Sequence, residues 1–291
     1  MEKKRQSRKS VLCVLAAGML WGCMGILVRT MKEGGFDSLE VTAFRSFVTT
    51  VLMFGGMFLF KREELKIRGR DIWCFVGTGV LSITFFNVCY FSCMNHTTLS
   101  VAAILLYTAP SFVMVLSALL FREKLTPRKL LALGLAFAGC VLVSGGFDGT
   151  GIGMAGLLTG LGAGFGYALY SIFGRYALQK GYSSYTITSY TFLFALLGTM
   201  PFMDAGHFVK CMRMGAGILP FATFMAIVTT VAAYLLYTAG LKGLENSKAS
   251  IIASVEPVMA SAVGFLLYKE AMPPLGAAGM ILVLLSCFLV A

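Results

Sequence analysis

One long stretch of this chain occurs twice, and this repeat is the strongest constraint on its fold. Residues 100–143 read SVAAILLYTAPSFVMVLSALLFREKLTPRKLLALGLAFAGCVLV, and residues 247–290 read SKASIIASVEPVMASAVGFLLYKEAMPPLGAAGMILVLLSCFLV. At a constant offset of 147 the copies align without a gap, pairing Ser100 with Ser247, Pro110 with Pro257, Glu123 with Glu270 and Pro127 with Pro274. Such a repeat predicts two halves of similar build, with the working site at the seam between them.

The apolar character of the repeat extends to the whole chain. Of its 291 residues, 58% are hydrophobic and only 13% are charged, whereas soluble domains have about 25% charged residues. Such a chain cannot cover itself with polar side chains, so its solvent must be largely lipid. The net charge of +11 comes from basic residues at the ends of apolar runs. This is the pattern of membrane topology, and it argues against a nucleic-acid-binding face.

Apolar runs predict ten membrane-spanning helices, at residues 11–31, 39–60, 72–94, 99–121, 129–146, 152–175, 184–203, 215–241, 248–268 and 273–291. If the N-terminus is cytoplasmic, the inner segments hold 18 lysines and arginines and the outer segments hold five. This asymmetry favours an inner-membrane protein with both termini in the cytoplasm. Each half then has five spans, so equivalent helices cross in opposite directions and the repeats are inverted, as in many secondary transporters.

The domain organisation follows from these spans. We expect a basic cytoplasmic tail over residues 1–10, a first repeat over 11–146 and a second repeat over 152–291. The N-terminal apolar run is longer than the apolar region of a signal peptide, so we expect it to be retained as the first span. Glycines spaced four residues apart at Gly156, Gly160 and Gly164 predict close packing of the sixth span against another helix.

No catalytic, cofactor-binding or metal-binding pattern is expected. The eight cysteines lie almost entirely inside apolar runs and form no Cys-x-x-Cys pair, so we interpret them as small buried hydrophobic residues. His96 and His207 fall in predicted loops, away from any zinc-binding spacing. The glycines of residues 151–156 match the dinucleotide fingerprint only formally, because they open a predicted membrane helix and follow no strand. We therefore expect neither an enzyme, nor a cofactor, nor a bound metal.

Two charged residues fall inside predicted spans. Glu256 lies about 12 Å from the start of the ninth span, at 1.5 Å per residue, which is close to the middle of the bilayer. An ionisable group there usually faces a cavity or a partner, and Pro257 loosens the preceding turn. The carboxyl group could bind a substrate ammonium, carry a proton or fasten the helix. Arg45 could meet a substrate carboxylate, but we favour its reaching outward or pairing with Glu40.

Polar and aromatic residues recur at equivalent places in the spans. Asn87 with Tyr90, and Tyr234 with Tyr237, lie three residues apart on one helix face at matching positions of the two halves. Such symmetric faces suit the walls of a central cavity. The full set of candidate cavity residues is Trp21, Asn87, Tyr90, Tyr107, Tyr167, Tyr170, Tyr234, Tyr237 and Ser254, and the candidates for gating or coupling are Pro110, Glu256 and Pro257. The plain alternative for each aromatic residue is packing.

The chain resembles the drug/metabolite transporter superfamily, specifically its ten-helix EamA-type members. The residues that carry the resemblance are Trp21-Gly22, Phe44-Arg45, Pro110, the segment Arg122-Glu123-Lys124-Leu125-Thr126-Pro127, Glu256-Pro257, and Lys269-Glu270 before Pro273 and Pro274. The resemblance implies an all-α integral membrane protein, with ten helices in two inverted five-helix repeats around a central cavity. It implies that spans 1, 3, 4, 6, 8 and 9 wall the cavity, with spans 5 and 10 further out. It also implies that Glu256 gates rather than selects the substrate, and that Glu123 and Glu270 cap the helices that follow them.

These observations predict a secondary transporter that exports a small amino acid or related metabolite by alternating access. Its partners would be the lipid bilayer, the metabolite and, as a candidate coupling ion, the proton, with Pro110 and Pro257 as bending points. The alternative is efflux of drugs or aromatic compounds, which the aromatic, charge-poor interior would suit. A membrane sensor or scaffold that transports nothing is the least favoured hypothesis, because the sequence predicts no soluble domain to carry a signal.

Overall fold

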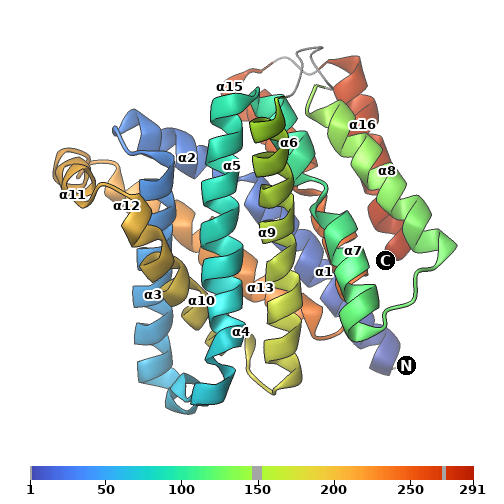
Figure 1. Ribbon diagram of the computed structural model, residues 1–291, viewed down its shortest axis with the longest axis horizontal. Helices are drawn as coiled ribbons and strands as arrows, with labels where there is room; N and C mark the ends of the chain where they lie inside the picture. The colour runs from blue at the N-terminus through green and yellow to red at the C-terminus, as the bar shows by residue number, and fades with distance from the viewer. Residues whose placement is uncertain (1, 146–152, 271–272) are drawn as a thin grey trace.

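The computed structural model describes residues 2–145, 153–270 and 273–291, and all the regular secondary structure in these ranges is helical (Figure 1). The first half comprises α1 (Glu2–Gly22), α2 (Met24–Glu33), α3 (Ser38–Phe60), η1 (Arg62–Leu65), η2 (Gly69–Asp71), α4 (Ile72–Val76), η3 (Gly77–Thr84), α5 (Phe85–His96), α6 (Leu99–Leu106), α7 (Ala109–Phe121) and α8 (Pro127–Val143). The second half comprises α9 (Met154–Gln179), α10 (Ser184–Thr199), η4 (Met200–Phe202), α11 (Ala205–Met214), α12 (Leu219–Ala226), η5 (Ile227–Ala232), α13 (Ala233–Leu241), α14 (Asn246–Ala253), α15 (Glu256–Tyr268) and α16 (Pro274–Val290).

The internal repeat is present in the structure as well as in the sequence. At the offset of 147, helices α6, α7 and α8 correspond to α14, α15 and α16 with identical first and last positions. The π-helical segments η3 and η5 also overlap at this offset, so α4–η3–α5 corresponds to α12–η5–α13. The two halves therefore share not only their helices but also their irregularities.

Proline breaks the two equivalent helical paths at the same point. Helix α6 ends at Leu106 and α7 begins directly before Pro110, whereas α14 ends at Ala253 and α15 begins directly before Pro257. Proline has no N–H to bond the carbonyl four residues back, and its ring crowds that carbonyl. The turn before each proline therefore opens, and the predicted bending points coincide with these breaks.

Helices α8 and α16 pack against each other near the right of Figure 1 and run antiparallel. A Cβ atom added at Gly139 would lie 2.7 Å from the carbonyl oxygen of Gly279, and one at Gly279 would lie 2.6 Å from that of Gly139. Only glycine allows backbones to approach this closely. Since α8 and α16 are equivalent in the repeat, their opposite directions are those of an inverted pair. The glycines of α9 allow a similar approach to Leu105 of α6, which confirms the predicted close packing of that span.

Seven helical segments of the described residues are long and apolar enough to cross a membrane: α1–α2, α3, η2–α5, α6–α7, α9, α12–α13 and α14–α15. Helix α10 with η4 and α11 would make an eighth, but this pair bends by 109°. The other predicted spans are helical too, but α8, α10 and α16 have only 17, 16 and 17 residues. About 20 residues are needed to span the hydrocarbon core. Both α8 and α16 begin at a proline, a residue whose fixed φ suits the first position of a helix.

Two segments expected outside the spans are helical. The basic residues predicted as a tail belong to α1, which begins at Glu2, because lysine, arginine and glutamine favour helix. The predicted loop that contains His207 forms α11, whose N-terminus is capped by Asp204 through hydrogen bonds from the backbone N–H groups of Gly206 and His207. His96 is likewise the last residue of α5 rather than part of a loop. Of these helices, α11 is the one that the sequence did not indicate, because its N-cap signal is the single residue Asp204.

Candidate functional site

A cavity of about 440 Å³ enters the bundle between its two halves. Its rim includes Arg29, Ser38, Ser144 and Glu270, so it opens at the end of the bundle where α2, α8 and α15 end and α3 begins. We call this the mouth end. In Figure 1 it lies opposite the N-terminus. Helices α1, α2, α3, α5, α6, α9, α13 and α15 all line the cavity. The family resemblance implied neither the wall from α3 nor the contribution of Val143 at the end of α8, which belongs to a span expected further out.

Eight of the twelve residues proposed for the cavity and for gating line this cavity together, namely Trp21, Asn87, Tyr90, Tyr107, Tyr167, Tyr234, Glu256 and Pro257. The other four lie outside it. Tyr170 and Tyr237 line a crevice of about 10 Å³ beside Trp21, and Pro110, Ser254 and Tyr237 line one of about 20 Å³ beside Glu256. Both crevices are too small to hold more than a water molecule.

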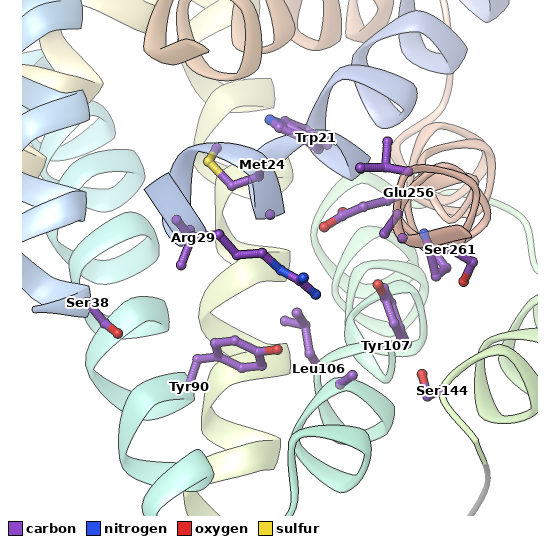
Figure 2. A pocket seen from close by; sticks show the side chains of 18 of the residues that line it. Trp21, Met24, Arg29, Ser38, Tyr90, Leu106, Tyr107, Ser144, Glu256 and Ser261 are labelled. Carbon is purple, nitrogen blue, oxygen red and sulfur yellow. The ribbon is translucent and has the colours of Figure 1, made fainter. Parts of the chain in front are cut away.

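Glu256 is the acidic group in the depth of the cavity. It is the first residue of α15, where the proline break exposes the N-terminus of a helix, and its half-buried carboxylate accepts a hydrogen bond from the Tyr167 hydroxyl at 3.1 Å. Figure 2 shows the carboxylate of Glu256, the hydroxyl groups of Tyr90 and Tyr107 and the guanidinium of Arg29 pointing into the same space. The break thus places a carboxylate and several hydrogen-bonding groups around one small volume.

Arg45 is the basic group of the cavity wall, and its predicted outward reach or pairing with Glu40 is wrong. Only 6% of the residue is exposed, and it lines the cavity from α3. Within the described residues, no carboxylate lies within salt-bridge distance of Arg45, because Glu40 pairs instead with His207. One turn away on α3, Thr42 donates to the side-chain carbonyl of Asn87 at 3.1 Å. The sequence reasoning undervalued Arg45 because it could not see that α3 borders the cavity.

The rest of the wall is largely aromatic. The ring of Trp21 lies 5.1 Å from that of Tyr234 and 6.1 Å from that of Tyr167, both in edge-on geometry. Behind them, Tyr170 shares a hydrogen bond with Thr238, and Tyr237 shares one with Ser171, each at 2.7 Å. The second layer therefore holds the first in place, and it closes the bundle on the side of the cavity away from the mouth.

An ion pair joins the two halves at the mouth. Arg29 of α2 forms a salt bridge with Glu270, which follows α15. The guanidinium also lies 4.1 Å from the centre of the Tyr268 ring. About half of each charged side chain is exposed, at 48% and 51%, so solvent screens the attraction. At an offset of 146 in the repeat Arg29 is the equivalent of Arg175, and at 147 Glu270 is the equivalent of Glu123.

We call the opposite end of the bundle the clasp end. It is closed by hydrogen bonds of Glu123 and Arg175, and the side chain of Glu123 is more buried than that of Glu270 at the mouth. Glu123 accepts hydrogen bonds from the backbone N–H groups of Asn246 and Ser247, at 2.7 and 3.2 Å, and from the Ser247 hydroxyl. Arg175 donates to the Asn246 side chain at 2.8 Å and to the Leu244 carbonyl. The prediction that Glu123 and Glu270 cap the helices that follow them is therefore wrong. Glu123 caps α14 of the other half, because its own helix α8 is already capped by Thr126.

A separate group on α3 and α11 has the donor atoms of a metal site. One donor atom from each of Glu40, His207 and Cys211 lies within 4.8 Å of the others, a set that spacing could not reveal because Glu40 is far away in the chain. His207 Nδ1 and Glu40 Oε1 are 2.8 Å apart, and this carboxylate raises the pKa of His207. Burial raises the pKa of the Cys211 thiol. The raised pKa values of His207 and Cys211 favour their protonated forms over metal binding. We therefore interpret the three residues as a contact that holds α11 against α3.

Comparisons with known proteins agree with this architecture. The sequence profile of the EamA-like transporter family matches residues 8–145 and again residues 154–291. An uncharacterized transporter of Archaeoglobus fulgidus is 27% identical over 91% of this chain and 90% of its own length. The uncharacterized transporter YwfM of Bacillus subtilis is 23% identical over 96% and 92%. A Salmonella typhimurium protein named "Probable amino-acid metabolite efflux pump" is 22% identical over 97% and 95%. One crystal structure, 16% identical, matches 97% of this chain and 96% of its own with a TM-score of 0.79, which shows a shared fold.

Proposed function

The chain belongs to the EamA-like transporter family, and from this premise we propose that it exports a small amino acid or related metabolite by alternating access. The observation that carries the substrate class is the pair of opposite charges, Glu256 and Arg45, in the wall of one cavity. An amino acid has an ammonium and a carboxylate group, so it matches both. The name of the similar Salmonella typhimurium protein supports the direction of transport.

The cavity suits a zwitterion of modest size. Its volume of about 440 Å³ lies in the range of small-molecule sites, roughly 300–1,000 Å³. Glu256, oriented by Tyr167, would bind the ammonium group at the exposed helix terminus. Arg45 would bind the carboxylate with two parallel hydrogen bonds, a geometry that guanidinium favours. The rings of Trp21 and Tyr234 would then contact the substrate side chain.

For the topology, we propose ten membrane crossings, with the shorter helices α8, α10 and α16 included and the two five-helix repeats inverted. The antiparallel packing of α8 and α16 supports this arrangement. With both termini in the cytoplasm of an inner-membrane protein, the mouth would face outward. The described conformation would then be outward-open, with the cavity closed by the clasp end. Protons are the candidate coupling ion, and Glu256 is the residue that would carry one.

A comparison of metabolites released by cells tests this function. Cells that overproduce the protein should release at least one amino acid or related metabolite faster than cells that lack it. Cells that produce equal amounts of the Glu256→Gln or Arg45→Gln variant serve as matched controls, and their release should be lower. Equal extracellular amino acids and related metabolites in all these cultures would refute the proposed substrate class.

Efflux of drugs or other aromatic compounds is the second candidate, and the aromatic cavity wall around Trp21 favours it. Arg45 discriminates between the two functions. A transporter of lipophilic cations has no use for a guanidinium in its cavity, so Arg45→Gln would leave or improve efflux of a cationic dye. The same variant would impair export of an amino acid.

A further inference from the structure

The two charged turns of the repeat have the same local geometry. Arg122 and Lys269, at equivalent positions, are the described residues other than glycine with a left-handed backbone, with φ of 55° and 54°. The N–H of Glu123 then bonds the Ser117 carbonyl at 3.2 Å, and that of Glu270 bonds the Gly264 carbonyl at 3.1 Å. The backbone therefore places both glutamates in the same way relative to the helix that precedes them. Any difference in their contacts must come from the residues available to bind them.

The binding place of Glu123 also has an equivalent in the other half. Glu123 holds the first two residues of α14, Asn246 and Ser247. The equivalent residues are Leu99 and Ser100, the first two of α6, and both α6 and α14 have eight residues. Serine recurs at the second position, so the hydroxyl donor is kept as well.

The two binding places differ in occupancy. Asn246 is fully buried, whereas Leu99 is 66% exposed. The side chain of Glu123 is 9% exposed and that of Glu270 is 51% exposed. At α6, Thr98 accepts from the N–H of Val101, and no hydrogen bond among the described residues involves the N–H groups of Leu99 or Ser100. The site at the clasp end is thus filled, whereas the N–H groups of its equivalent at the mouth end have no partner among the described residues.

We propose that Glu123 and Glu270 form two alternating clasps, of which the structure shows one closed. This proposal rests on the proposed alternating access. When the mouth closes, Glu270 leaves Arg29 and binds the N–H groups of Leu99 and Ser100 and the Ser100 hydroxyl. At the clasp end, Glu123 then releases α14 and the cavity opens. A carboxylate at a helix N-terminus satisfies N–H groups that have no partner within the helix, and it matches the helix dipole.

Arginine completes each clasp in the same way. Arg175 donates to the carbonyl of Leu244, just before α14. Its repeat partner Arg29 now pairs with Glu270. In the mouth-closed state Arg29 donates instead to the carbonyl of Thr97, the equivalent of Leu244. While the mouth is open, Arg29 and Glu270 therefore pair with each other instead of binding their partners at the N-terminus of α6.

The two clasps differ in strength because the repeat is imperfect there. Lys129 lies 3.9 Å from Glu123 and supports the clasp end, but its equivalent is Gly276. Arg175 also bonds the side chain of Asn246, whose equivalent is Leu99. The mouth clasp lacks both contacts. Without substrate, the open-mouth state is therefore the more populated one.

Hydrogen exchange of the full chain in lipid nanodiscs tests the alternation without any substrate. In Glu123→Ala, exchange at residues 246–247 should rise at least about tenfold, because a charge-assisted hydrogen bond is lost. Exchange at residues 99–100 should fall, because the mouth clasp then closes more often. In the double variant Glu123→Ala/Glu270→Ala, exchange at residues 246–247 should still rise, but exchange at residues 99–100 should no longer fall. Glu63→Ala, which removes an exposed carboxylate elsewhere, should change neither segment.

Two outcomes would overturn the alternating clasps. One is that exchange at residues 99–100 is the same in Glu123→Ala as in the wild type. The other is that exchange at these residues falls as much in Glu123→Ala/Glu270→Ala as in Glu123→Ala. Residues 127–143 of α8 report on general unfolding, and if they also lose protection, Glu123→Gln replaces the alanine variant. Since substrate takes no part, this result is independent of the proposed amino-acid export. Amino-acid transport can be absent while the exchange data still show alternating clasps. Equally, transport can be present while the exchange data show none.

Discussion

Replacing Arg45 by glutamine should selectively remove the recognition of a carboxylate. Arg45 is 6% exposed, lines the cavity and has no carboxylate partner within the described residues, so its charge is available to a ligand. A hydrogen bond to a charged group contributes about 1.5–3 kcal/mol. The loss should therefore weaken binding of an amino acid about 10- to 150-fold. The amine that lacks the carboxylate should lose less than about twofold.

Tryptophan fluorescence measures this binding directly. Trp21 lines the cavity, and Trp73 is the other tryptophan of the chain, so the background Trp73→Phe isolates the signal. The matched control is Arg45→Lys, which keeps the charge but loses the two-pronged geometry and should fall between the wild type and Arg45→Gln. Equal losses for the amino acid and its amine, or no loss for either, would refute the role of Arg45. Unchanged thermal unfolding in all variants would exclude misfolding as the cause.

Two further predictions concern stability and pH. Gly139→Ala should lower the free energy of unfolding by about 1–3 kcal/mol, because its Cβ would lie 2.7 Å from the Gly279 carbonyl oxygen. Gly134→Ala, on the same helix with open space around it, is the control in thermal unfolding, and equal melting temperatures would contradict the packing described. His207, whose pKa is raised by its hydrogen bond to Glu40, should stabilise the protein below its ordinary pKa of about 6.5. This contribution should disappear as pH rises through the raised value. His207→Gln should remove that pH-dependent step from thermal unfolding, and a profile like that of the wild type would contradict the pairing.

Much of the fold could be predicted from the repeat. Pro110 and Pro257 occupy equivalent positions of the repeat, which predicted two equivalent bending points. Both helical paths break there because proline removes the same backbone hydrogen bond in each half. Matching positions also predicted most of the cavity wall, since Asn87 and Tyr234 occupy equivalent faces of α5 and α13. Local chemistry and periodicity determine such features, and both can be seen in the sequence.

Partners between distant segments could not be predicted in the same way. The repeat identified Glu123 and Glu270 as equivalent, yet one binds the N-terminus of α14 and the other pairs with Arg29. Equivalence describes the contacts that both residues could make, whereas the described conformation gives only Glu123 the contact with a helix N-terminus. Arg45 was misjudged for a related reason, because the position of α3 beside the cavity depends on packing across the two halves.

Counterflow in reconstituted vesicles tests the central claim most directly. Vesicles loaded with an unlabelled amino acid should transiently accumulate the same labelled amino acid from outside, because an alternating carrier exchanges one for the other. Glu256→Gln should abolish the acceleration of transport by a pH gradient, since its side chain cannot carry a proton. Arg45→Gln should reduce counterflow itself. If no amino acid or related metabolite shows counterflow in the wild type, the proposal of a zwitterion exporter is contradicted.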